Sequence, residues 1–292
     1  MNSKTISDKI VERTAPSPTG GLHLGHVFSI IKAYENARKN FGLFKIRIED
    51  IDFTRCKIHF EKEIISNLSW LGINWDGRIM RQRNRISHYA DAIKQLMKDG
   101  LLYPCSCTRQ DINNSVSAPH SKVKSNLVYP GTCRNKKHDK PIKALRLDMK
   151  KAVQKLSEKN LSFFERVGED ENYLKDQLIP SEKLTSEFGD FIISRKDIGT
   201  SYNLAVVIDD AAQMVTHVTR GKDLLAVTPI QVLLQKLLNL PTPIYHHHAL
   251  LCENSGKKLS KRHSAETVSS LIKQGFTADE VIHMAFTWRK KS

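Results

Sequence analysis

The chain has 292 residues, of which 40% are hydrophobic and 26% charged, proportions typical of a folded globular protein rather than a disordered one. No stretch approaches the roughly 20 uninterrupted apolar residues of a membrane-spanning helix, and the first residues lack the apolar segment of a secretory signal, so we expect a cytoplasmic protein without a membrane partner. The formal net charge of +15 favours a polyanionic partner such as a nucleic acid.

The first hundred residues alternate short apolar runs with helical patterns. An apolar run at Ile10 leads through a Pro/Ser/Gly-rich turn into a helix from about Gly25 to Asn40. Alternating apolar and charged residues predict a strand at 44–48, and helical spacing predicts helices at 58–71 and 86–98. This order of elements predicts a parallel sheet with crossover helices.

Residues 104–140 differ from what precedes them. They are rich in Ser, Asn, Lys and Pro, show no sustained period and contain Cys105, Cys107 and Cys133. An odd total of five cysteines argues against a disulfide framework, so we interpret the cluster as a metal site that holds an insertion together.

The rest of the chain continues with strands and short helices. Apolar runs predict strands at 143–149 and 191–210, the second with a turn at 196–199, and another strand at 248–251. Helices are expected at 228–238, 267–273 and 278–286.

Two histidines three residues apart open the first predicted helix, in His23-Leu24-Gly25-His26. The unpaired N–H groups and positive dipole of a helix start favour an anion, so the motif is suited to nucleotide phosphates. For an isolated motif, a capped helix with two surface histidines is the simpler interpretation.

A cationic segment, Lys258-Leu259-Ser260-Lys261-Arg262, stands near the other end of the chain. Such a segment can close on a triphosphate and neutralise developing charge, although solvated basic loops are also common.

In this order, and more than two hundred residues apart, the two motifs resemble the HIGH-type and KMSKS-type motifs of class I aminoacyl-tRNA synthetases. Three further segments resemble the glutamate-specific branch: Arg13–Gly20, Arg47–Asp52 and Leu71–Asp76. The resemblance implies an α/β fold with a Rossmann-like parallel-sheet nucleotide-binding core, a zinc-binding insertion and a short helical C-terminal extension.

The resemblance also implies roles for particular residues. An arginine would face a substrate carboxylate, and Glu49 would accept from the α-ammonium group of L-glutamate. Which arginine takes which carboxylate stays open. The expected glutamate-binding residues are Arg13, Thr14, Ala15, Pro16, Ser17, Glu49, Tyr202 and Arg220. The residues expected to serve ATP, with Mg²⁺ on the phosphates, are His23, Gly25, His26, Lys258, Ser260 and Lys261.

About thirty residues follow the cationic segment, too few for an anticodon-binding domain. A core that stops there resembles the glutamyl-Q tRNA(Asp) synthetase family, which attaches activated glutamate to queuosine at the wobble position of tRNA(Asp). A short or truncated glutamyl-tRNA synthetase that charges a tRNA 3′ end is the nearest alternative. A catalytically inactive RNA- or protein-binding relative is another.

The same resemblance implies that Cys105, Cys107, Tyr129 and Cys133 bind Zn²⁺. His120 or His138 as the fourth ligand, and a degenerate site without metal, stay open. We expect a monomer with a catalytic core at 1–103 and 191–240, an inserted zinc-binding subdomain at 104–190, and the KMSKS-type segment with a short helical region at 241–292.

Overall fold

A parallel sheet forms where the sequence alternates apolar strands with helices. The computed structural model describes residues 9–108, 110–112, 128–136, 140–156, 160–167, 173–252, 259, 266–288 and 290–291. Strand β1 (Val11–Thr14) pairs in parallel with β2 (Leu43–Ile48), which pairs in parallel with β3 (Met80–Arg81). The prediction of a parallel arrangement at the start of the chain is confirmed.

A second sheet continues beyond β1. Its order is β7-β6-β10-β9, in which β6 (Asn160–Val167) and β9 (His217–Gly221) flank β10 (Ile244–His248) in parallel. The N–H of Thr216 donates to the Val11 carbonyl at 3.0 Å, which brings β9 beside β1. The strand order therefore reverses between β1 and β9, and ligands of such sheets bind at the carboxyl ends of the strands at this point.

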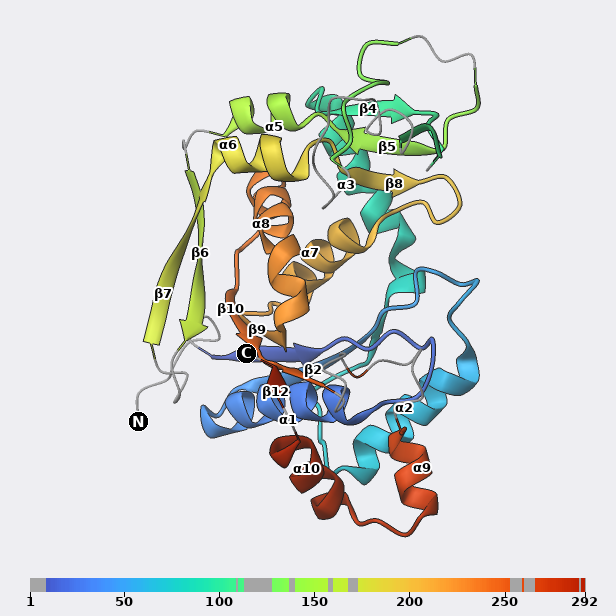
Figure 1. Ribbon diagram of the computed structural model, residues 1–292, viewed down its shortest axis with the longest axis vertical. Coiled ribbons are helices and arrows are strands. Elements are labelled where there is room, and N and C mark those ends of the chain that lie inside the picture. The colour runs from blue at the N-terminus through green and yellow to red at the C-terminus, as the bar shows by residue number, and fades with distance from the viewer. Residues whose placement is uncertain are drawn as a thin grey trace.

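Helices cover both faces of these sheets (Figure 1). On one face lie α1 (Leu24–Lys39), α2 (Ile58–Trp70), α9 (Val268–Lys273) and α10 (Ala278–Thr287). On the other lie α3 (Ile86–Lys98), α7 (Tyr202–Ala212) and α8 (Thr228–Leu237). All except α7 are confirmed predictions, with bounds within a residue or two of those expected.

Each face has its own apolar core. Side chains of α1, β2, α2, α9 and α10 form one cluster, and those of α3, β5, β6, α7 and α8 form the other. The amphipathic helices are thus held by burial of their apolar stripes, the main stabilising contribution in a domain of this size.

The segment 191–210 was predicted as strand with a turn at 196–199, and the prediction is wrong for the part after the turn. Only β8 (Ile192–Arg195) is a strand, whereas α7 begins at Tyr202. The side chain of Ser201 caps this helix by accepting from the Leu204 N–H at 3.4 Å. Leu204 to Val207 are all buried, so this apolar run has no polar face. The sequence pattern of such a helix cannot be distinguished from that of a buried strand.

The predicted strand at 248–251 is confirmed except at Ala249, but it missed most of the strand that precedes it. The main strand there is β10, which ends at His248, and only the short β11 (Leu250–Leu251) follows. It pairs with β12 (Lys290–Lys291). Three histidines close β10, and their polarity concealed a strand that is buried by the neighbouring strands.

A small antiparallel sheet of order β4-β5-β8 joins β4 (Leu102–Cys105), β5 (Ala144–Leu147) and β8. Between β5 and β8 come α5 (Met149–Lys155), the β6–β7 hairpin with β7 (Tyr173–Pro180), and α6 (Ser181–Lys183). The hairpin falls within the expected insertion at 104–190 but extends the larger sheet, while the proposed domain boundaries stay a prediction. Among the described residues, no helix has the length and apolarity needed to cross a membrane.

A buried ion cluster ties the two halves of the chain together. Arg47 of β2 is fully buried, and it donates to Asp210 at 2.5 Å, to Glu49 at 3.1 Å and to Gln213 at 3.2 Å. Asp210 also accepts from Arg13 at 3.1 Å. Charges in the protein interior are tolerated only when paired, so β1, β2 and α7 are fixed relative to one another by this cluster.

We predict that Arg47→Met lowers the free energy of unfolding by about 3–5 kcal/mol, because Glu49 then loses its partner and Asp210 keeps only Arg13. Urea unfolding followed by circular dichroism measures the loss. The matched control is Arg55→Met, since this exposed arginine pairs with Asp52 on the surface and should contribute less than about 1 kcal/mol. An equal effect of both changes would contradict the prediction.

Candidate active site

A cavity of about 250 Å³ lies at the carboxyl ends of β1 and β9, where the strand order reverses. The neighbouring cavity, of about 300 Å³, contains Ser17 and shares Glu49 and Tyr202 with the first. Residues far apart in the sequence are therefore brought together around one space. The predicted site residues on the wall of the first cavity are Arg13, Thr14, Ala15, Pro16, His23, Gly25, His26, Glu49, Tyr202 and Arg220.

The cationic segment is only partly described. Lys258, Ser260 and Lys261 lie outside the described residues, but Leu259 lines the first cavity. Its N–H donates to the Leu251 carbonyl at 3.0 Å. The early histidine motif and a residue of the late cationic motif thus meet on the same cavity.

The histidine pair forms the amino-terminal end of α1. The backbone N–H of His23 donates to Nδ1 of His26 at 3.1 Å, and the two rings stack with centroids 3.7 Å apart. A Cβ on Gly25 would stand 3.0 Å from the His23 ring, so a larger residue would push this ring aside. The first turn of α1 contains no acidic residue, and its helix dipole therefore favours an anion in the cavity.

Glu49 carries a negative charge with little water around it. Burial raises the pKa of Glu49 even though Arg47 and Arg13 act in the opposite direction. Burial acts the same way on Asp210, but there Arg47 and Arg13 outweigh it and hold the pKa below the ordinary value. A cationic group that enters the cavity would therefore stabilise the Glu49 carboxylate more than that of Asp210.

The two arginines on the cavity wall have different surroundings. Arg13 is paired with the carboxylate of Asp210, as described above. Arg220 instead donates to three side chains other than carboxylates, namely Thr228 and Gln231 at 2.8 Å each and His247 at 3.0 Å. Both arginines are at most 6% exposed, and a buried guanidinium facing a cavity suits a carboxylate.

Several of these residues were not predicted from the sequence. Arg47, Asp210 and Gln213 hold the ion cluster, and Thr228, Gln231 and His247 surround Arg220. Paired acids at the end of an apolar run, Asp209 and Asp210, are a signal for buried ion pairs that could have revealed the first group. Of the second group, only the row of three histidines in β10 stands out in the sequence.

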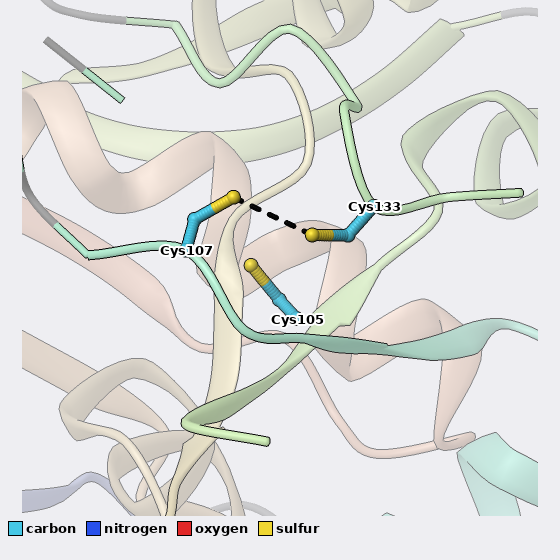
Figure 2. A group of neighbouring side chains, drawn as sticks. All are labelled: Cys105, Cys107 and Cys133. Atoms are coloured by element: carbon cyan, nitrogen blue, oxygen red, sulfur yellow. Dashed lines mark hydrogen bonds between the residues drawn. The ribbon is translucent and has the colours of Figure 1, made fainter. Parts of the chain in front are cut away.

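The three clustered cysteines meet beside the small antiparallel sheet (Figure 2). Their Sγ atoms all lie within 4.8 Å of one another, with Cys107 and Cys133 separated by 3.4 Å. The hydroxyl of Tyr129 lies 3.5 Å from Cys105 Sγ and 3.4 Å from Cys107 Sγ. Three sulfur atoms and one oxygen thus converge as a set that could hold a metal; His120 and His138 lie outside the described residues.

The charge state of the cluster is suited to a cation. Burial tends to raise the pKa of Cys133, but a hydrogen bond from Tyr129 and one from the Ser106 backbone outweigh it and lower this pKa to about 6. Burial raises the pKa of Cys107 to about 11. One thiol is therefore ready to ionise without a metal, and a cation would stabilise the remaining thiolates.

The charges around the main cavity complement a small zwitterion with an excess of negative charge. Arg13 and Arg220 offer two positive groups, Glu49 offers one desolvated negative group, and α1 offers its positive end. A molecule with two carboxylates and one ammonium group has the complementary charges.

The sequence is similar to those of known proteins. Residues 9–286 match the family model for the catalytic domain of class I tRNA synthetases (E and Q). A glutamyl-Q tRNA(Asp) synthetase from Rhodobacter capsulatus is 43% identical over 280 residues, which cover 93% of this chain and 98% of that protein. One from Cupriavidus metallidurans is 39% identical, with coverage of 91% and 81%.

Solved structures show the same fold. The glutamate–tRNA synthetase of Elizabethkingia anophelis superposes with a TM-score of 0.76 at 23% identity. The match covers 96% of this chain, which spans 61% of that structure's length.

Proposed function

Since the chain belongs to the class I tRNA synthetase family for glutamate and glutamine, and within it to the glutamyl-Q tRNA(Asp) synthetases, we propose that it activates L-glutamate with ATP and transfers it to queuosine of tRNA(Asp). The observation that carries the proposal is the cavity that combines Arg13, Arg220 and Glu49 with the start of α1. The positive groups complement the two carboxylates of glutamate, and Glu49 complements its ammonium group.

The proposed first step is adenylate formation. The α-carboxylate of glutamate attacks the α-phosphate of ATP, the bond to the β-phosphate breaks, and pyrophosphate leaves. No protein nucleophile is required, so the residues act by holding the two substrates in line and by stabilising the spreading negative charge. His23, Gly25 and His26 are proposed to bind the phosphates at the start of α1, together with Lys258, Ser260, Lys261 and Mg²⁺.

The proposed second step is attack of an acceptor hydroxyl on the activated carbonyl, with AMP as the leaving group. The cavity of about 300 Å³ beside Glu49 and Tyr202 supports this step, because it adjoins the glutamate-binding residues and is separate from the helix start. Ser17 and Ser201 give its wall hydroxyl groups suited to a hydroxylated nucleoside. We propose that the chain acts as a monomer in the cytoplasm.

The cysteine cluster is proposed to bind Zn²⁺ through Cys105, Cys107, Cys133 and the Tyr129 oxygen. In a tetrahedral site with Zn–S bonds of about 2.3 Å, sulfur atoms lie about 3.8 Å apart, close to the observed spacing of the thiols. The metal would stabilise the small sheet and would take no part in the reaction.

We expect glutamate-dependent ATP–pyrophosphate exchange by the purified chain in the absence of tRNA. Glu49→Gln should lower kcat/KM for glutamate about 10- to 100-fold, because the ammonium group loses a charged partner. Glu187→Gln, at an exposed position, is the control and should leave the exchange unchanged. A folded wild-type chain without exchange would refute the proposed activation of glutamate.

The acceptor is tested with radiolabelled glutamate and separate samples of tRNA(Asp) and tRNA(Glu). RNase digestion should place the label in the anticodon loop of tRNA(Asp), and only in tRNA that contains queuosine. Label at the 3′ end of tRNA(Glu) would instead identify a charging enzyme.

Metal analysis should find about one Zn²⁺ per chain, and Cys133→Ser should lose most of it and lower the melting temperature. Cys56→Ser removes a thiol outside the cluster and should retain the metal. Wild-type protein that is folded and free of zinc would contradict this assignment.

A further inference from the structure

The guanidinium of Arg220 is held from three sides. It has five N–H groups, and among the described residues His247 takes the one on Nε, Gln231 takes one on Nη1 and Thr228 takes one on Nη2. One N–H on each terminal nitrogen then remains for a ligand. A carboxylate can accept from N–H groups on both terminal nitrogens of one guanidinium.

His247 can accept this hydrogen bond in only one tautomer. Its Nδ1 lies 2.9 Å from Glu165 Oε2, and its backbone N–H donates to Glu165 Oε1 at 3.0 Å. Because a carboxylate only accepts, Nδ1 carries the proton, and Nε2 presents its lone pair to Arg220. The two side chains are 1% and 7% exposed, so water does not compete for these contacts.

The other two partners of Arg220 are fixed as well. The amide nitrogen of Gln231 donates to Asn203 at 3.2 Å, so its oxygen faces the guanidinium. The ring of Tyr245 lies beneath Arg220, 5.0 Å from ring centroid to guanidinium carbon. The charge of Glu165 lies behind the imidazole, and thus the front of Arg220 stays available to an anion.

We propose that Glu165 and His247 are positioning residues for substrate recognition: they lock Arg220 in the orientation that presents its two free N–H groups to a carboxylate of the bound amino acid. This inference rests on the proposed function, because it takes the ligand of Arg220 to be glutamate. Neither Glu165 nor His247 is on the wall of the cavity that contains Arg220.

The arrangement has a defined dependence on pH. Protonation turns Nε2 of His247 from an acceptor into a donor, which then opposes the Nε–H and the charge of Arg220. The charged groups around His247 are Glu165 on β6, Arg220 on β9 and Asp223, which follows β9. Burial lowers the pKa of His247 below 6.5 against the influence of Glu165, so the ring is neutral near pH 7. Arg220 is therefore locked at neutral pH and released as the pH falls below the pKa of His247.

Two variants of His247 test the proposal in the exchange assay. His247→Leu removes the acceptor and should raise KM for glutamate about tenfold to a hundredfold, with KM for ATP changed less than about twofold. His247→Gln can still accept from Arg220 and donate to Glu165, but it does not titrate. It should match the wild type at about pH 7.5 and lack the rise in KM that the wild type shows in acid.

A third variant tests Glu165 itself. Glu165→Gln keeps an acceptor for Nδ1–H but removes the negative charge that favours the imidazolium, so the acid rise in KM for glutamate should move to lower pH. Equal melting temperatures establish that each variant is folded.

The proposal is overturned if His247→Leu leaves KM for glutamate unchanged, if KM for ATP rises equally, or if His247→Gln keeps the wild-type acid response. Absence of exchange in the wild type would refute the proposed function instead, so the two failures are distinguishable.

Discussion

The pairing of Arg47 with Asp210 joins two parts of the chain that are 163 positions apart. Arg47 follows the buried side chains of β2, and Asp210 stands near the end of α7, whose first residue is Tyr202. A fully buried guanidinium has no access to water, so the only low-energy arrangement is the one in which these segments meet. Glu49, which directly follows β2, and Tyr202, the first residue of α7, are placed on the cavity wall as a result.

The two arginines on the cavity wall, and likewise the carboxylates of Glu49 and Asp210, differ in their electrostatic surroundings. The charge of Arg13 is balanced by Asp210. The hydrogen-bond partners of Arg220 are uncharged, and the nearest negative charge described above, that of Glu165, lies on the far side of His247. Glu49 has a raised pKa and Asp210 a lowered one, although the two carboxylates share Arg47. Glu49 and Arg220 are thus less compensated than Arg13, and binding of a charged ligand changes the free energy most at such groups.

Part of the fold and of the candidate site could be predicted from the sequence. The turn at 15–21, the histidine motif and the amphipathic helices have strong local signals, and their placement was correct. The cysteines were grouped correctly because their spacing limits where they can meet. The helix α7 was missed because its burial on all sides removes the helical period. The contacts of Arg220 were missed because Glu165, His247 and Gln231 are brought together only by strand pairing and by the packing of α8, which no local pattern encodes.

The outer strand β7 contributes little to either apolar core, and Tyr173 and Leu178 on it are about two-thirds exposed. Its pairing along the whole of β6 nevertheless keeps solvent from that edge of the sheet. Without β7, strand β6 would become an open edge, and water there would raise the local dielectric constant around Glu165. The strand therefore keeps water away from the buried contact between Glu165 and His247, although much of its own apolar surface is exposed.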